Sequence, residues 1–207
     1  MGIPSYFSYI VKNHRNIIKL ISTLSPFLIS FFFLMSSILH QNLKGFVYLL
    51  GVILASLLNI GLLQFFSNND LIEKEINKPI SCGILDLPKI VPQTSIPCTN
   101  SIFHTFTISY LLISMKNSGE INYILLTFLS LIFVIDFVTR YMNKCTNLIG
   151  ILLGSVFGGI YGVSWYTLWS HYKVKEVLYY DELTSNNVKC LKTKQKFICK
   201  KRKTLDG

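Results

Sequence analysis

The stretch TNLIGILLGSVFGGIYGVSWYTLWS, residues 146–170, decides the fold class of this chain. It contains no charged side chain. A helix needs about 20 apolar residues to cross the hydrocarbon core of a bilayer, so the stretch predicts a membrane-spanning helix. Glycine recurs at every fourth position along it, which places these residues on one face of that helix: Gly150, Gly154, Gly158 and Gly162.

A stripe of small residues lets a second helix approach closely, which is how many helices associate in lipid. The sequence leaves two partners for the stripe open. One is another helix of the same chain, and the other is a second copy of the protein in a homo-oligomer. We expect packing within the chain, with self-association as the alternative.

Four further apolar runs precede this stretch, at residues 20–39, 45–66, 98–115 and 121–139. Together the five runs predict an all-α, polytopic transmembrane helix bundle of about five spans. Residues 67–97 are polar and contain four prolines, so they are expected to form a loop. We divide the chain into a basic N-terminal segment (1–19), a transmembrane helical domain (20–170) and a basic C-terminal tail (171–207).

Charge is scarce in this chain and unevenly distributed. Only 14% of the 207 residues are charged, against about 25% in an average soluble domain. This composition excludes a disordered chain and disfavours a water-soluble enzyme. The chain has 20 Lys and Arg against 10 Asp and Glu, and ten of those cations lie in the tail. We therefore expect an integral membrane protein with a cytosolic tail.

Two charged side chains fall inside an apolar run. Asp136 and Arg140 are four residues apart, so they share a helix face and can form an ion pair. Charges at membrane depth indicate a functional site, unless the pair lies at the interface and is only structural. His104, in the run 98–115, is a candidate catalytic residue or a hydrogen-bonded structural residue.

The order of these pieces resembles the type-2 phosphatidic acid phosphatase superfamily. Its motifs are Lys-x6-Arg-Pro, Pro-Ser-Gly-His and Ser-Arg-x5-His-x3-Asp, followed by a Gly-x3-Gly helix. The matching region of this chain covers roughly residues 67–165. Its matches are Lys74 and Lys78-Pro79 near the first motif, Ser101-Ile102-Phe103-His104 at the second, and Thr139-Arg140 at the third.

The resemblance implies a site for a phosphorylated lipid. It assigns phosphate binding to Lys74, Lys78 and Arg140, and catalytic roles to His104 and Arg140. The chain departs from the family where Thr146 replaces the nucleophilic His and Gly150 replaces its Asp partner. A phospho-His intermediate needs an imidazole at that place. We therefore expect a lipid-binding, catalytically inactive relative that needs no cofactor.

The first ten residues, MGIPSYFSYI, also resemble the N-terminus of the 5′→3′ exoribonuclease family. Those nucleases hold two metal ions with acidic side chains, but the first acidic residue of this chain is Asp70. We treat this likeness as incidental and expect neither nuclease activity nor nucleic-acid binding from it.

Two features remain in the loops and the tail. The tail holds eight cations between residues 189 and 203, which predicts contact with anionic lipid headgroups or a role in setting topology. A localisation signal or an RNA-binding tail is the alternative.

The five cysteines lack the spacing of a metal site, so no metal is expected. Cys82, Cys98 and Cys145 are expected on one membrane face, where two of them can form a disulfide if that face is lumenal.

Overall fold

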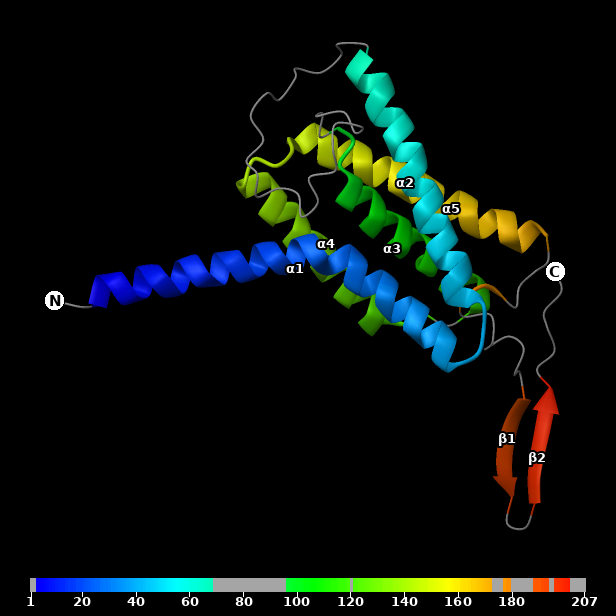
Figure 1. Cartoon of the computed structure of the whole chain (residues 1–207). Coiled ribbons are helices and arrows are strands. Elements are labelled where there is room, and N and C mark those ends of the chain that lie inside the picture. Colours follow the sequence, from blue (N-terminus) through cyan, green and yellow to red (C-terminus); the bar gives the residue numbers. More distant parts are fainter. Residues whose placement is uncertain are drawn as a thin grey trace.

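The computed structural model describes residues 3–68, 96–119, 121–172, 177–179, 188–193 and 196–201. Five α-helices account for most of them, and they form the bundle in Figure 1. Their bounds are α1 Ile3–Leu39, α2 Lys44–Asn68, α3 Thr99–Ser118, α4 Tyr123–Met142 and α5 Leu148–His171. The predicted all-α helical bundle is confirmed.

The ends of α2 to α5 lie within three residues of the apolar runs in the sequence. In contrast, α1 begins at Ile3 and so includes most of the segment that we had separated as a basic N-terminal region. Figure 1 shows that α1 bends, with its first half pointing away from the bundle. Pro26 lies inside this helix, and proline is the usual cause of such a bend because it removes a backbone hydrogen bond.

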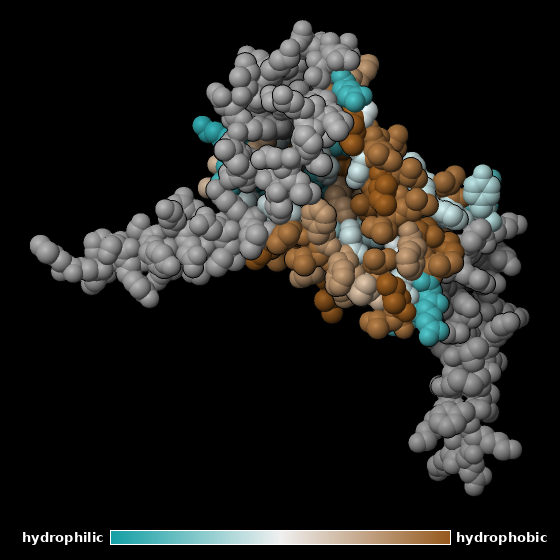
Figure 2. All heavy atoms as spheres, in the orientation of Figure 1, coloured by the Kyte–Doolittle hydropathy of each residue, from teal (hydrophilic) through white to brown (hydrophobic). Residues whose placement is uncertain are grey.

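Four helices are long and apolar enough to cross a membrane: α1 over Ile21–Leu39, α2 over Lys44–Phe65, α4 over Tyr123–Met142 and α5 over Leu148–His171. Their outer faces expose many large hydrophobic side chains, among them Phe32, Leu57, Ile124 and Val156. Figure 2 shows this as a broad hydrophobic surface over the described part of the bundle. By length and composition the chain is an integral membrane protein.

The third predicted span, α3, differs from the other four because it is less apolar. Half of its 20 residues are buried, and Figure 1 shows it between the other helices. Its polar side chains bond to its neighbours: Asn59 of α2 donates to Thr99 at 2.8 Å, and Thr107 shares a 2.8 Å bond with Tyr48 of α2. Since other helices rather than lipid surround it, α3 tolerates polar residues that an exposed span would not.

The glycine stripe of α5 lies against α3. A Cβ atom added at Gly154 would meet the carbonyl oxygen of Cys98 at 2.6 Å, and one added at Gly162 would meet that of Phe106 at 2.5 Å. The contact residues advance along both helices together, so α3 and α5 run parallel. Both helices therefore begin at the same end of the bundle, which we call the α3/α5 entry end.

A short hairpin in the tail was not predicted from the sequence. It consists of β1 Val188–Thr193 and β2 Lys196–Lys201, paired antiparallel with Cys190 opposite Cys199. Nearer the bundle, Leu178 is buried and the hydroxyl of Tyr179 donates to the carbonyl of Phe33 at 2.9 Å. The start of the tail is thus fixed to the end of the bundle opposite the entry end.

Candidate functional site

Six polar side chains gather inside the bundle near the entry end, and we call them the polar cluster: Ser22, Ser25, Asn100, His104, Asp136 and Arg140. Asp136 is its centre and is fully buried. Its Oδ1 atom accepts three hydrogen bonds, from Ser22 Oγ at 2.6 Å, Asn100 Nδ2 at 3.2 Å and Arg140 Nε at 3.1 Å. Three helices thus converge on one carboxylate oxygen.

Local sequence explains how each helix reaches the carboxylate. Asp136 and Arg140 are one helical turn apart in the last part of α4, so they face the same side. Asn100 lies in the first turn of α3, which starts just after Cys98. Ser22 lies on the part of α1 that packs in the bundle, and a small hydroxyl side chain fits between closely packed helices.

The other carboxylate oxygen of Asp136 differs from Oδ1. Asp136 Oδ2 is buried, and no described group donates a hydrogen bond to it. Most buried polar atoms in proteins are hydrogen-bonded, so an exception requires an explanation. Asp136 Oδ2 is therefore an acceptor without a donor among the described residues, at the centre of the polar cluster.

Arg140 forms the ion pair through Nε, and its side chain is 15% exposed against 1% for Asp136. A guanidinium has five N–H donors, and the bond to Asp136 uses one of them. The pair itself is electrically neutral. The two cations that the sequence analysis assigned beside it, Lys74 and Lys78, lie outside the described residues.

His104 is buried one turn further into α3, where Phe103 and Phe133 contact its ring. Its Nε2 atom lies 3.1 Å from Ser25 Oγ. Ser25 donates its own proton to the carbonyl of Ser22 at 2.8 Å, so we assign His104 Nε2 as the donor in this pair. No described hydrogen bond joins His104 to Arg140. The structure thus brings these two candidates into one cluster without direct contact.

A serine beside a histidine also suggests a nucleophile and its base. A working pair needs the serine to donate to the histidine, and a third group to orient the ring. Here the proton of Ser25 goes to a carbonyl, and Asp136 bonds to Ser22 rather than to His104. The described geometry therefore does not form a hydrolytic triad.

Thr146 and Gly150 occupy the two positions where the resemblance implies a His and its Asp. Thr146 is buried, and a Cβ atom added at Gly150 would lie 2.5 Å from Thr146 Oγ1. An aspartate therefore does not fit at position 150 without a shift of its neighbours.

Asn147 caps α5 by accepting from the Gly150 amide at 2.8 Å. Beside this cap, the Cys98 amide donates to the Gly150 carbonyl at 2.9 Å, which holds the starts of α3 and α5 together.

Two cysteines of the entry end have different states. Cys145, between α4 and α5, is disulfide-bonded, whereas Cys98 has a free and buried thiol. The third cysteine of this predicted group, Cys82, lies outside the described residues. No group of three or more metal-ligating side chains occurs in the part of the chain that the structure describes.

Sequence reasoning identified Asp136, Arg140 and His104 but missed three members of the polar cluster. Ser22 and Ser25 are small polar residues three apart in an apolar run, and Asn100 precedes His104 by one turn. Polar side chains one turn apart inside a predicted span are the signal that marks such a cluster.

Comparison with known proteins does not extend this description. The chain matches no protein-family model, no curated protein and no solved structure.

Proposed function

We propose that this integral membrane protein binds a phosphorylated lipid at the entry end and does not hydrolyse it. The observation that carries the proposal is the position of Arg140. Asp136 holds it through Nε, at the end of the bundle where α3 and α5 begin. The remaining N–H donors of a guanidinium suit the paired oxygens of a phosphate group.

Helix electrostatics support binding of an anion at this end. Each helix N-terminus carries the equivalent of about half a positive charge, and it attracts phosphate groups. Here two N-termini are adjacent, because the Cys98 amide bonds to the Gly150 carbonyl. Asp136 cancels the charge of Arg140, so the two helix ends and the exposed Lys144 between α4 and α5 supply the positive potential within the described residues. Lys74 and Lys78 stay a prediction as further phosphate ligands.

The absence of hydrolysis follows from the residues at the expected nucleophile position. Thr146 offers a hydroxyl instead of an imidazole, and a hydroxyl needs a base to remove its proton. Among the described hydrogen bonds, Thr146 Oγ1 donates to the carbonyl of Asn147 at 3.5 Å, and His104 Nε2 is bonded to Ser25. Gly150, at the position of the expected Asp, supplies no carboxylate to orient a base.

Binding can be measured with the full chain in phosphatidylcholine nanodiscs that contain a small fraction of phosphatidate. We expect Arg140→Gln to reduce phosphatidate retention about tenfold, since a hydrogen bond to a charged group contributes about 1.5–3 kcal/mol. Lys116→Gln is the matched control, because it removes one cation at the opposite end of α3 and should leave retention unchanged. Equal retention by both variants would refute the proposed site.

Hydrolysis is tested separately by release of inorganic phosphate from phosphatidate and from a prenyl diphosphate. We expect no release above a protein-free blank. Turnover by the wild-type chain that disappears in Arg140→Ala would show that the protein is an enzyme.

We further infer that the entry end faces an oxidising compartment and the tail faces the cytosol. Cys145 at the entry end is disulfide-bonded, and disulfides persist in oxidising compartments. With five spans, the tail side carries twelve Lys and Arg and the entry side eight, in agreement with the positive-inside rule. The lipid phosphate would then lie in the lumenal or outer leaflet, and the basic tail would contact anionic headgroups of the cytosolic leaflet.

Self-association through the glycine stripe remains the competing proposal. In the described chain α3 already covers Gly154, Gly158 and Gly162, so this face has no space for a second copy. We therefore favour lipid binding over a structural role based on that stripe.

A further inference from the structure

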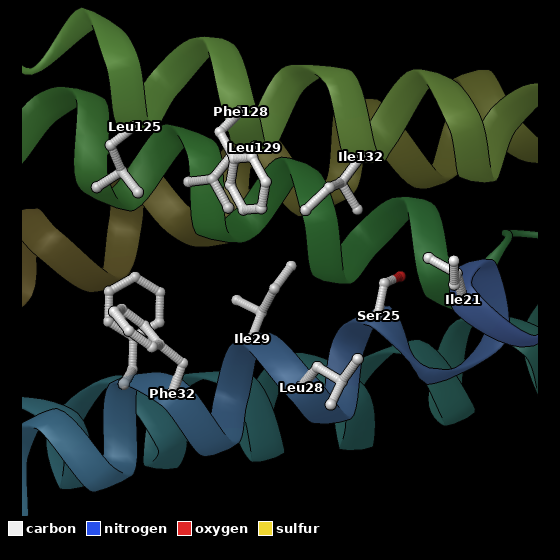
Figure 3. Close-up of a pocket in the computed structure, with 10 residues that line it drawn as sticks. Ile21, Ser25, Leu28, Ile29, Phe32, Leu125, Phe128, Leu129 and Ile132 are labelled. Carbon is white, nitrogen blue, oxygen red and sulfur yellow. The ribbon is translucent and has the colours of Figure 1, made fainter.

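A groove of about 530 Å³ runs between α1 and α4 on the outside of the bundle. Nine of its ten lining residues are apolar, and the tenth is Ser25. Figure 3 shows the side chains of the two helices facing each other across it. Both walls belong to candidate membrane spans, so the groove lies at the depth of lipid hydrocarbon.

The groove is open to its surroundings, because Leu28 and Phe32 of α1 and Phe128 of α4 are each more than half exposed. Water is a poor occupant, since a stable buried water needs two to four polar partners and Ser25 is the only polar residue among the described residues of the lining. A flexible hydrocarbon chain matches an elongated apolar space between two membrane helices. Acyl or prenyl chains are also the molecules that surround such helices in a bilayer.

One end of the groove connects to the polar cluster. Ser25 lies near that end, together with Ile21, whereas Phe32 and Leu125 lie at the other end (Figure 3). Ser25 contacts His104 Nε2 at 3.1 Å and the carbonyl of Ser22, whose hydroxyl donates to Asp136. The polar cluster in turn contains the unsatisfied acceptor Asp136 Oδ2.

From this juxtaposition we infer that the groove binds one hydrocarbon chain of a membrane lipid, with the lipid headgroup at the Ser25 end beside Asp136 and Arg140. The partly exposed guanidinium of Arg140 can donate to the phosphate of a headgroup at that end. The identity of the headgroup rests on the proposed function, whereas the position of the chain rests on the groove alone. The ligand class is therefore a phosphorylated lipid whose chain lies between α1 and α4.

The test uses the full chain in phosphatidylcholine nanodiscs with two probes, phosphatidate and phosphatidylcholine, each carrying a diazirine in one acyl chain. After illumination, peptide mass spectrometry maps the crosslinked residues. We expect the phosphatidate crosslinks to concentrate on α1 and α4 at the groove residues. Crosslinks spread evenly over the exposed faces of α2 and α5 as well would overturn the inference.

Filling the groove provides the matched comparison. Ile132→Trp places a large side chain in the groove, whereas Leu131→Trp places the same side chain on the exposed outer face of α4. We expect Ile132→Trp to reduce groove crosslinking about tenfold, equivalent to about 1.4 kcal/mol of affinity, and Leu131→Trp to leave it unchanged. If Ile132→Trp does not fold, Leu28→Trp fills the groove from the α1 wall. Equal crosslinking by filled and control variants would refute the inference.

Arg140→Gln separates this inference from the proposed function. Groove crosslinks with no preference for phosphatidate over phosphatidylcholine, in both the wild-type chain and Arg140→Gln, would refute the phosphate site and leave the chain site intact. Phosphatidate retention that depends on Arg140 but gives no groove crosslinks would refute the chain site and leave the proposed function intact.

Discussion

Asp136 is the fully buried centre of the polar cluster. Its Oδ1 atom accepts from α1, α3 and α4 at once, so it joins three helices through one atom. A buried charge is stable only if it is paired and hydrogen-bonded, and Arg140 supplies the pairing. Removing either partner leaves an uncompensated charge in a region with little water.

At this scale we predict that Asp136→Asn and Arg140→Gln each lower stability, by about 3 kcal/mol, because each leaves the other charge unpaired. The double variant should lose less than the sum of the single losses, since it removes both charges. Thermal unfolding of the three variants in detergent checks this. Strictly additive losses would mean that the ion pair contributes nothing to stability.

The positions of Ser22 and Ser25 beside Asp136 and His104 could not be predicted from the sequence. Asp136 and Arg140 were predicted as a pair because their spacing on one helix is fixed by the chain itself. Ser22 and Ser25 join them only because α1 is rotated to face α3 and α4. That rotation depends on the packing of whole helices, which local sequence does not encode.

At the scale of elements, the contact between α3 and α5 organises the bundle. Hydropathy predicted the helices well because transfer into lipid is nearly a sum over residues, so each long apolar run is recognisable by itself. It predicted less about α3, whose polar side chains are stable in the membrane because neighbouring helices bond to them. The hairpin of β1 and β2 was missed because a short charged segment has no strong hydropathy pattern.

The glycines of α5 provide a matched test of the α3–α5 contact. A Cβ added at Gly158 would clash with the carbonyl oxygen of Ile102, whereas one added at Gly159 meets only Ser109 Oγ at 3.6 Å. Both substitutions to alanine improve helix propensity by about 1 kcal/mol. We predict that Gly158→Ala nevertheless destabilises by about 1–3 kcal/mol through overpacking, whereas Gly159→Ala is neutral or stabilising.

This prediction is checked by comparing the thermal unfolding midpoints of the two alanine variants in the same detergent. Similar shifts for both would show that the close approach of α5 to α3 is not a determinant of stability. A crosslinked dimer that disappears in Gly158→Ala without loss of stability would instead favour self-association through the stripe.

The whole molecule has two chemically different ends. The entry end carries the disulfide-bonded Cys145, the polar cluster and the starts of α3 and α5. The opposite end carries the docked Tyr179 and leads to the basic tail. We predict that an N-glycosylation acceptor fused after Gly207 stays unmodified in cells, whereas one fused before Met1 is modified when it is far enough from the bilayer.

The measurement is a gel shift that is removed by a glycosidase. The reverse pattern would place the tail in the oxidising compartment and contradict the orientation inferred from Cys145. Modification of both fusions would contradict the prediction that the chain crosses the membrane five times.

The disulfide at Cys145 gives a further prediction for the whole molecule. Reduction of the folded protein should lower its thermal unfolding midpoint, because a disulfide typically contributes about 2–4 kcal/mol by restricting the unfolded chain. Cys145→Ser should show the lower midpoint from the start and no further response to the reductant. An unchanged midpoint after verified reduction would show that the bond does not contribute to stability.

The central position of α3 has a consequence for how the protein is made. This helix packs closely against Gly154, Gly158 and Gly162 of α5. The ribosome adds these glycines some 50 residues after the part of α3 that they contact. While the ribosome is still adding α4, α5 does not yet pack against α3. We therefore expect the close packing around α3 to be completed only after α5 has been made.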